Sequence, residues 1–463
     1  MLKKMTTYLL ATGLLCANAL TQATSYWNWQ STNTSAIQFP QGFLWGATTL
    51  AYEVEGTATN NTWHTHESYV KSDGQPFAKE SSGIACDHWN RYAEDAQLMG
   101  NIGLNSHCLS LDWSAIEPTP GVFDEQALQH YADVCDEDNR NGVAPMIIFK
   151  DYRDPAWFIE RGGFEKTSNI ALFERYCLKV FQALSGKAYN FITFWAPESY
   201  AALAYWNNSH PPFKHSMQLT ARVFKNQLDA HVRVYNALKH ADTEKKIRIG
   251  IVKHVHRLEP WYAWDKLACH LADQLTDAPF YSFFTTGMFK VRMAVPGRLN
   301  ANVYHVNKMA SKSIDFIGIN YHSHGYMKNF KKLSWNNPKE IATDLPGFTL
   351  YPEGLYGAIK EVSERMGAVL NIPIYITQNG VATTNDDLRT LHTQRHLYAV
   401  SQAIKAGYNV QGYYYYNLMD GYTWGGYSKK FGLFAVDRTT LTRTLKPGAE
   451  YYLNVVNRFA HEA

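Results

Sequence analysis

The amino-acid sequence predicts a single (β/α)8 barrel, an α/β fold, because eight short apolar segments alternate with amphipathic ones along one chain. The apolar segments are rich in β-branched and aromatic residues, which is typical of strands buried on both faces. Between them, apolar residues recur at helical spacing, for example over 89–99 and 173–184. A doubly wound open sheet is disfavoured because no Gly-rich phosphate loop follows the first predicted strand. The expected strands are 43–48, 107–111, 145–149, 191–195, 247–252, 315–321, 374–377 and 412–418.

The composition fits a globular protein with a deep core. Of the 463 residues, 46% are hydrophobic and 14% are aromatic, and the formal net charge is only +3. This charge balance, without a basic run or an acidic tail, does not favour binding to nucleic acid or to an anionic membrane surface. Most aromatic residues are expected in the core, although their number also suits a site that stacks on sugar rings. A chain of this length can form one large barrel domain.

The N-terminus has the three parts of a secretory signal. Lys3 and Lys4 precede an apolar run, residues 8–16, and small residues follow, with cleavage expected after Ala19 or Ala23. The apolar run is too short to span a bilayer comfortably, which favours a cleaved signal over an anchor. We therefore predict a secreted or periplasmic protein without a stable membrane anchor, with a signal peptide at 1–23, an irregular segment at 24–37 and the barrel at 38–458.

The cysteines give no sign of a disulfide framework or a zinc site. Five remain beyond the signal segment, and both their odd number and their wide spacing are atypical of such sites. Cys177 falls on the apolar side of a predicted helix, where an inert buried thiol is expected. The spacing of Cys108, Glu53, Asp151 and His322 does not support a metal site either, so no metal or cofactor is expected.

The residues that follow the predicted strands are the candidates for a functional site. In (β/α)8 barrels the active site lies at the C-terminal ends of the strands. The region 322–352, with scattered Gly and Pro, is expected to form a long loop over this barrel mouth. The residues of interest after the strands are Glu53, Asp151, Ala196, Glu198, His322, Gln378 and 420–424.

Five segments resemble glycoside hydrolase family 1, the β-glucosidase family. The segment "FPQGFLWGATTLAYEVEG" at 39–56 is similar to the N-terminal signature of that family. The segments "ACDHWNRYAEDAQLMGNIGLNS", "DFIGINY", "ITQNG" and "GYSKKFGLFAVD" continue the resemblance in the family's order, over roughly residues 38–455. The resemblance implies a (β/α)8 barrel and a retaining β-glycosidase site. Such a site needs two carboxylates roughly 5 Å apart, one a nucleophile and the other an acid/base.

Both of these carboxylates are absent from the matching positions. Where the family has Thr-Phe-Asn-Glu-Pro after the fourth strand, this chain has Ala196 before Pro197. Where the family has Ile-Thr-Glu-Asn-Gly after the seventh strand, this chain has Gln378. An amide keeps the shape of a carboxylate but lacks the anionic oxygen that attacks the sugar, and a methyl group cannot transfer a proton. Loss of acid/base assistance alone typically costs about 10²–10⁴ in rate.

The residues expected around the two positions also differ from the family pattern. The arginine and the tyrosine that the family places beside its nucleophile correspond to Cys108 and His322. At three sugar-binding positions, Glu53 replaces a glutamine, Asp151 a histidine and Trp195 an asparagine. Thr423 stands where the family has a sugar-binding glutamate. The residues predicted to bind a ligand are Glu53, Asp151, Trp195, His322, Gln378, Tyr416, Thr423 and Trp424.

Three functions are compatible with this pattern. The first is a non-catalytic pseudo-glycosidase that binds a carbohydrate, a glycoconjugate or a protein partner at the barrel mouth. The second is an active O-glycosyl hydrolase that uses displaced carboxylates from among Glu53, Asp151 and Glu198. The third is a different enzyme in which Cys108 and His322 form a nucleophile and base pair, which requires hydrogen-bond contact between them.

Overall fold

The computed structural model describes residues 26–460, apart from 58–59, 72–73, 296–298 and 334. The predicted signal peptide, 1–23, lies outside the described residues. Residues up to Ala36 and residues from Ile37 onward form two compact units. Residues 26–36 of the first unit contain turns, and the barrel belongs to the second unit.

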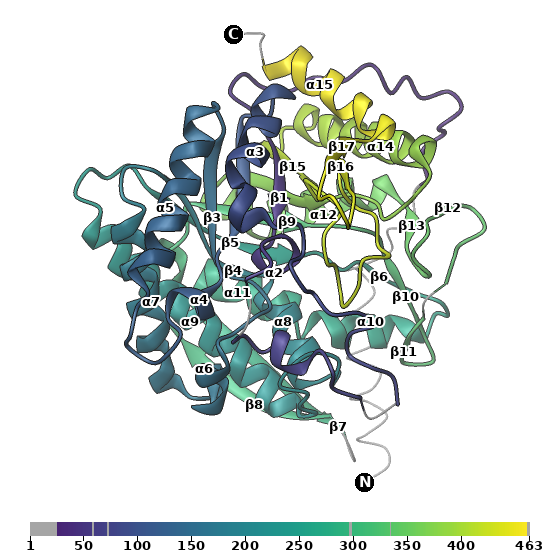
Figure 1. The fold of residues 1–463 in the computed structure, drawn as a ribbon. Coiled ribbons are helices and arrows are strands. Elements are labelled where there is room, and N and C mark those ends of the chain that lie inside the picture. Colours follow the sequence, from purple (N-terminus) through teal and green to yellow (C-terminus); the bar gives the residue numbers. More distant parts are fainter. Residues whose placement is uncertain (1–25, 58–59, 72–73, 296–298, 334, 461–463) are drawn as a thin grey trace, which may run out of the picture. The chain divides into compact units, whose positions relative to one another are not determined.

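Eight parallel strands close into a barrel, which confirms the predicted (β/α)8 fold (Figure 1). Each apolar run that was expected to be a strand forms one of them, with bounds that differ by a few residues. The strands pair in the order β1-β15-β14-β9-β5-β4-β3-β2, and pairing of β2 with β1 closes the barrel. The barrel strands are β1 (Leu44–Thr49), β2 (Ser106–Ser110), β3 (Ala144–Lys150), β4 (Asn190–Trp195), β5 (Arg248–His254), β9 (Phe316–Asn320), β14 (Ile374–Asn379) and β15 (Val410–Tyr416).

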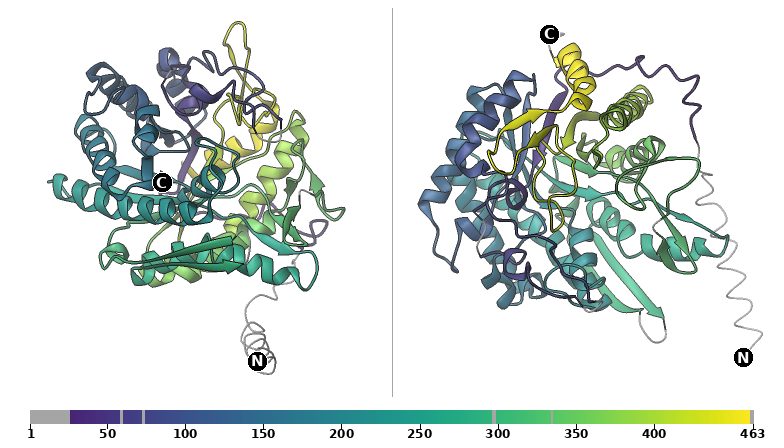
Figure 2. Two further views of the ribbon diagram at one scale, coloured as in Figure 1. Left: turned by 90° about the horizontal axis from the view of Figure 1, so that it is seen from below. Right: turned by 45° about the vertical axis from the view of Figure 1, so that its right-hand side comes forward.

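Helices surround these strands (Figures 1 and 2). Side-chain caps fix where some of them begin, because a cap satisfies backbone N–H groups that the first turn leaves unpaired. Asp124 caps α5 by accepting from the N–H groups of Gln126 and Ala127, and Asn385 caps α14. The helices are α2 (Ala51–Val54), α3 (His88–Asn101), α4 (Trp113–Ile116), α5 (Glu125–Arg140), α6 (Ala156–Glu160), α7 (Ile170–Ala183), α8 (Pro197–Tyr205), α9 (Met217–Ala241), α10 (Asp265–Asp273), α11 (Asp277–Thr286), α12 (Pro352–Val362), α13 (Ala368–Leu370), α14 (Asp386–Lys405) and α15 (Glu450–Ala460).

Large side chains from alternate strand positions fill the inside of the barrel. Because successive residues of a strand point to opposite faces, one set packs inward and the other packs against the helices. The inward cluster includes Cys108, Met146, Ile148, Ile192, Trp195, Val252, Phe316, Tyr375, Tyr414 and Tyr416, all buried. The interior is therefore a packed core that reaches up to the barrel mouth.

The expectation of an unstructured loop at 322–352 was wrong. This region contains β10 (Gly325–Lys328), β11 (Lys331–Leu333), β12 (Ile341–Ala342) and β13 (Thr349–Leu350). Strand β10 pairs with β11 and with β6 (Leu258–Pro260) in a three-stranded sheet. Further hairpins are formed by β7 (Met288–Val295) with β8 (Leu299–Val306) and by β16 (Phe434–Val436) with β17 (Arg443–Leu445). Among the described residues, every helix is too short or too polar to cross a bilayer.

Candidate functional site at the barrel mouth

Glu53 is buried at the barrel mouth, in the short helix α2 that follows β1. Its two carboxylate oxygens accept hydrogen bonds from the Tyr416 hydroxyl at 2.9 and 3.0 Å, and one also accepts from the Asn417 amide at 3.1 Å. Burial raises its pKa to about 7, against the attraction of Arg153 and the two hydrogen-bond donors. Glu53 therefore changes its protonation state near neutral pH.

Asp151, which follows β3, is held by an internal arginine. Arg153 donates to one oxygen of Asp151 through its backbone N–H and its Nε, each at 2.9 Å, and its Nη2 pairs with the other oxygen. Ser110 donates to that second oxygen at 2.9 Å. The carboxylate is thus fully engaged by groups of the chain itself, and both partners are buried.

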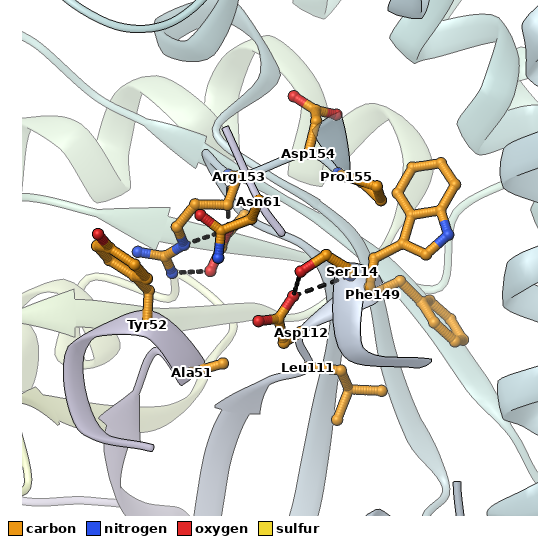
Figure 3. Close-up of a pocket in the computed structure, with 12 residues that line it drawn as sticks. Ala51, Tyr52, Asn61, Leu111, Asp112, Ser114, Phe149, Arg153, Asp154 and Pro155 are labelled. Carbon is orange, nitrogen blue, oxygen red and sulfur yellow. Dashed lines mark hydrogen bonds and ion pairs between the residues drawn. The ribbon is translucent and has the colours of Figure 1, made fainter. Parts of the chain in front are cut away.

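The Arg153 guanidinium occupies the polar part of the mouth. It lies over the rings of Tyr52 and Trp63, with its central carbon 5.5 and 5.6 Å from the ring centroids. Burial lowers its pKa, whereas attraction to Glu53 and Asp112 opposes that shift. Figure 3 shows the guanidinium beside Tyr52 and Asn61.

Little free space remains around Arg153. A cavity of about 10 Å³ lies there, which is at the lower limit for a single water molecule. Its lining comprises Ala51, Tyr52, Asn61, Leu111, Asp112, Trp113, Ser114, Phe149, Asp151, Arg153, Asp154 and Pro155 (Figure 3). A cavity of this size is too small for a sugar ring.

Ala196 and Glu198 lie where β4 passes into α8. Ala196 is fully buried, has a positive φ of 54°, and donates its N–H to the Val252 carbonyl at 2.9 Å. Oε1 of Glu198 accepts from the backbone N–H of His254 at 2.7 Å and lies 4.0 Å from Lys253 Nζ. Lys253 in turn packs on Phe280 of α11, outside the barrel. The contacts of Glu198 therefore lie on the outer side of the barrel, away from Glu53 and Asp151.

Gln378 and His322 contact each other at the ends of β14 and β9. His322 lies near the Gln378 side chain and the Gly380 backbone, both of which favour its protonated form, yet burial lowers its pKa to about 4. The imidazole is therefore neutral at pH 7. Gly380 makes the close turn possible, because a side chain there would collide with the carbonyl oxygen of Tyr416. The His322 ring lies within 5.5–6.5 Å of five other rings, namely His254, Phe348, Tyr416, Trp424 and Phe431.

The other candidate residues differ sharply in exposure. Trp195 and Tyr416 are part of the buried barrel interior, and Thr423 is also buried. Trp424 is 39% exposed and lies against Phe348 and Phe431. Cys108 packs inside the barrel, where burial raises the pKa of its thiol well above the ordinary value and keeps it protonated. A protonated, buried thiol is a poor nucleophile.

The comparisons with known proteins agree with the fold and the motifs. The family model described as Glycosyl hydrolase family 1 matches residues 35–460. The chain belongs to glycosyl hydrolase family 1. Beta-glucosidase A of Thermotoga maritima is 28% identical over 445 residues, which cover 90% of this chain and 98% of the relative.

Solved structures give the same result. A beta-glycosidase from Pyrococcus horikoshii aligns with a TM-score of 0.78 and 29% identity, covering 92% of this chain and 98% of the other. The beta-glucosidase from Thermotoga maritima in complex with deoxynojirimycin aligns with a TM-score of 0.79 and 26% identity, covering 92% and 100%. The whole glycosyl hydrolase family 1 barrel is therefore present in this chain.

Within this family frame, Arg153 is the residue that motif reading missed. The sequence motifs indicated Glu53 and Asp151 as site residues, and Arg153 was not among the predicted residues. The run "DYRD" at 151–154 could have indicated this role, because the arginine stands between Asp151 and Asp154. An arginine between two acids at a predicted site is a candidate internal counter-ion. The structure brings Arg153 together with Asp151 and Glu53, and it leaves Glu198 outside this group.

Glu53→Gln should stabilise the protein at alkaline pH. Because the folded-state pKa is raised from 4.5 to about 7, the wild type loses stability as the pH rises through this range. The neutral amide removes that loss, but its NH2 group replaces one acceptor oxygen and faces the donors Tyr416 and Asn417, so we expect a net gain of about 2 kcal/mol at pH 8. Urea unfolding at pH 5 and pH 8 measures it. An unchanged pH dependence in the variant would contradict the assignment of this titration to Glu53.

Proposed function

We propose that this chain is an exported, non-catalytic member of glycosyl hydrolase family 1 that binds a carbohydrate at the barrel mouth. One observation carries the proposal: the Arg153 guanidinium binds Asp151, so the chain itself engages this carboxylate at the barrel mouth. The chain also lacks a carboxylate at Ala196 and Gln378, the two positions where the family motifs have glutamate. A retaining glycosidase without a nucleophile cannot form the covalent intermediate.

The exposed rim of the mouth supports binding rather than deep enclosure of a ligand. Trp424 is 39% exposed, and behind it lie Phe348, His322 and Phe431. An indole face supported in this way can stack on the apolar face of a sugar ring. We therefore expect a shallow contact with the outer part of a glycan. A protein partner at the same rim is the outcome to consider if no glycan binds.

Hydrolysis assays test the absence of catalysis. We expect no turnover of aryl β-glycosides by the wild type, and none by the Ala196→Glu/Gln378→Glu double variant. The fully buried Ala196 site leaves little room for a longer side chain, and its positive φ disfavours residues other than glycine. Turnover by the wild type that Glu53→Gln or Asp151→Asn abolishes would contradict the proposal. Turnover in the double variant alone would show that the missing carboxylates are the main defect.

Binding to the rim is tested with the same protein. Titration with β-linked oligosaccharides should change the tryptophan fluorescence of the wild type, and Trp424→Ala should abolish the change. Trp264→Ala is the matched control, because Trp264 is also exposed but lies at the start of α10, as its N-cap residue. Equal responses of the two variants would contradict a site at Trp424.

A second candidate function is hydrolysis by displaced carboxylates, and the electrostatics of Glu53 favour it. A carboxyl group with a pKa of about 7 suits a general acid, and the neighbouring Asp151 is bound by Arg153. This activity would show a pH–rate profile with a limb near pH 7 that Glu53→Gln removes. It also requires Arg153 to leave the pocket, since Asp151 otherwise has no free oxygen.

A further inference from the structure

Four large apolar side chains lie exposed on one surface formed by α10 and the β10–β11 hairpin. Trp264 is 59% exposed, Leu267 55% and Phe330 54%, and Tyr262 is also exposed. We call Tyr262, Trp264, Leu267 and Phe330 the tip patch. It is independent of the barrel-mouth residues and plays no part in the function proposed above.

The members of the tip patch are neighbours in space. The Tyr262 and Trp264 rings stack with centroids 4.4 Å apart, and Leu267 follows Trp264 by about one helical turn. The backbone N–H of Phe330 donates to Asp265 Oδ1 at 3.3 Å, which ties the hairpin to the start of α10. Figure 1 shows α10 beside β10 and β11. Two of the four side chains therefore stack on each other just before α10, and the backbone of Phe330 is bound to the first residue of that helix.

Phe330 occupies a backbone position that normally favours glycine. Asn329 and Phe330 form the two-residue turn between β10 and β11, with φ values of 51° and 62°. Positive φ at both positions is the type I′ geometry, in which the second residue is usually glycine. A large aromatic residue there costs stability and, being exposed, gains no compensation from the core. Such a local cost at a surface position is characteristic of functional sites.

The charges beside Phe330 also oppose stability. Lys328 and Lys331 are directly opposite each other in the β10–β11 ladder, and like charges in that arrangement repel. Lys328 Nζ lies 4.4 Å from the centre of the Trp261 ring, next to the tip patch, and the exposed Lys266 lies on α10. The neighbouring acid, Asp265, is buried and accepts from backbone N–H groups. The surface around the tip patch is therefore cationic, although the net charge of the whole chain is small.

We propose that the tip patch docks on the headgroup region of an anionic lipid membrane. Aromatic and aliphatic side chains beside lysines match that region, where rings sit at the interface and lysines attract acidic headgroups. A hairpin tip is convex, so it fits a deformable surface better than a rigid protein groove. Leu267 and Phe330 favour apolar insertion over stacking on a sugar. The contact is peripheral and reversible, because four side chains bury far less apolar surface than a spanning helix.

Vesicle sedimentation with the full chain tests this proposal. We expect the wild type to bind vesicles of phosphatidylcholine with about one-third phosphatidylglycerol, more weakly at high salt. Phe330→Gly should weaken binding about tenfold, and Trp264→Ser/Phe330→Gly should weaken it further. Because glycine relieves the positive φ, Phe330→Gly should raise the thermal midpoint while it lowers binding. If Phe330 had only a structural role, its substitution would lower both the thermal midpoint and the binding to vesicles.

Controls separate this surface from other causes of binding. Every variant carries the same N-terminal segment, so any contribution of that segment to vesicle binding cancels when the variants are compared. Tyr304→Ser removes an exposed ring on β8 and should leave binding unchanged. Phe330→Asn, which also tolerates positive φ, is the second variant at the tip. Equal binding by wild type and both Phe330 variants would overturn the proposal. So would equally strong binding to pure phosphatidylcholine, or retention on a polysaccharide or protein without any binding to vesicles.

Discussion

Arg153→Met should lower the free energy of unfolding by about 3–5 kcal/mol at pH 7, because it leaves buried carboxylates without their counter-ion. Asp151 keeps its bonds from Ser110 and the backbone N–H of residue 153 but loses the guanidinium. Glu53 and Asp112 lose the cation that attracts them. Methionine fills most of the vacated volume, so the decrease in the free energy of unfolding reflects the lost charge more than a new cavity.

Urea unfolding at two pH values checks this result. The loss should be smaller at pH 5 than at pH 7, since carboxyl groups without the cation have raised pKa values and become protonated as the pH falls. Arg140→Met is the matched control, because Arg140 pairs with Glu137 on the surface and should change stability by no more than about 0.5 kcal/mol. A loss at residue 153 as small as the control's would contradict the counter-ion role.

The barrel strands were predictable because burial on both faces leaves a direct trace in the sequence. Runs such as Phe191–Trp195 are apolar except for one threonine, and parallel strands between a packed interior and a layer of helices favour that composition. Their exact ends were less predictable. Gln378 and Asn379 belong to β14, although the sequence favoured an end at Thr377, because polar residues at a strand's end resemble a turn.

The hairpin β10–β11 was missed for a different reason. A two-residue type I′ turn is usually recognised by Asn-Gly, and this chain has Asn329 followed by Phe330. Sequence rules identify structures that use favoured residues, so a turn that uses an unfavoured one escapes them. Phe330 at a positive φ is therefore both the reason that the hairpin was not predicted and an observation that supports a function for the tip patch.

Strand ends alone identified Glu53 and Asp151 as residues of the mouth, but not what they contact. Whether an acid binds a ligand or an internal cation depends on side-chain direction, which periodicity does not encode. Glu198 shows this clearly, because it lies in the first turn of α8, shortly after β4, and its side chain still turns toward Lys253 and the outer face of the barrel. A motif match therefore identifies the position of a residue, whereas the packing of the folded chain determines which groups its side chain contacts.

A buried acid–histidine–acid group holds the segment above the mouth in place, and its disruption is the second large effect that we expect. His324 Nδ1 lies 3.1 Å from Glu259 Oε1, and its Nε2 lies 2.9 Å from Glu340 Oε2. Glu340 also accepts from Thr349 and Asn337, so it joins β6, β10 and β13. Burial lowers the pKa of His324, but the hydrogen bonds and charges of both glutamates outweigh it and raise the pKa to about 9.

Glu340→Gln should therefore lower the free energy of unfolding by about 3–5 kcal/mol at pH 7, since it leaves a buried imidazolium with one carboxylate. The pH dependence fixes the cause. A histidine pKa raised from 6.5 to about 9 gives stability that is complete below pH 6.5 and is lost as the pH rises through 9. This loss, on the order of 3 kcal/mol in the wild type, should shrink in Glu340→Gln because the remaining glutamate raises the pKa of His324 less.

Urea unfolding at pH 6 and pH 9.5 measures this pH-dependent loss of stability, with the exposed Glu364→Gln as the control. Parallel pH curves for wild type and Glu340→Gln would show that His324 is not the titrating group.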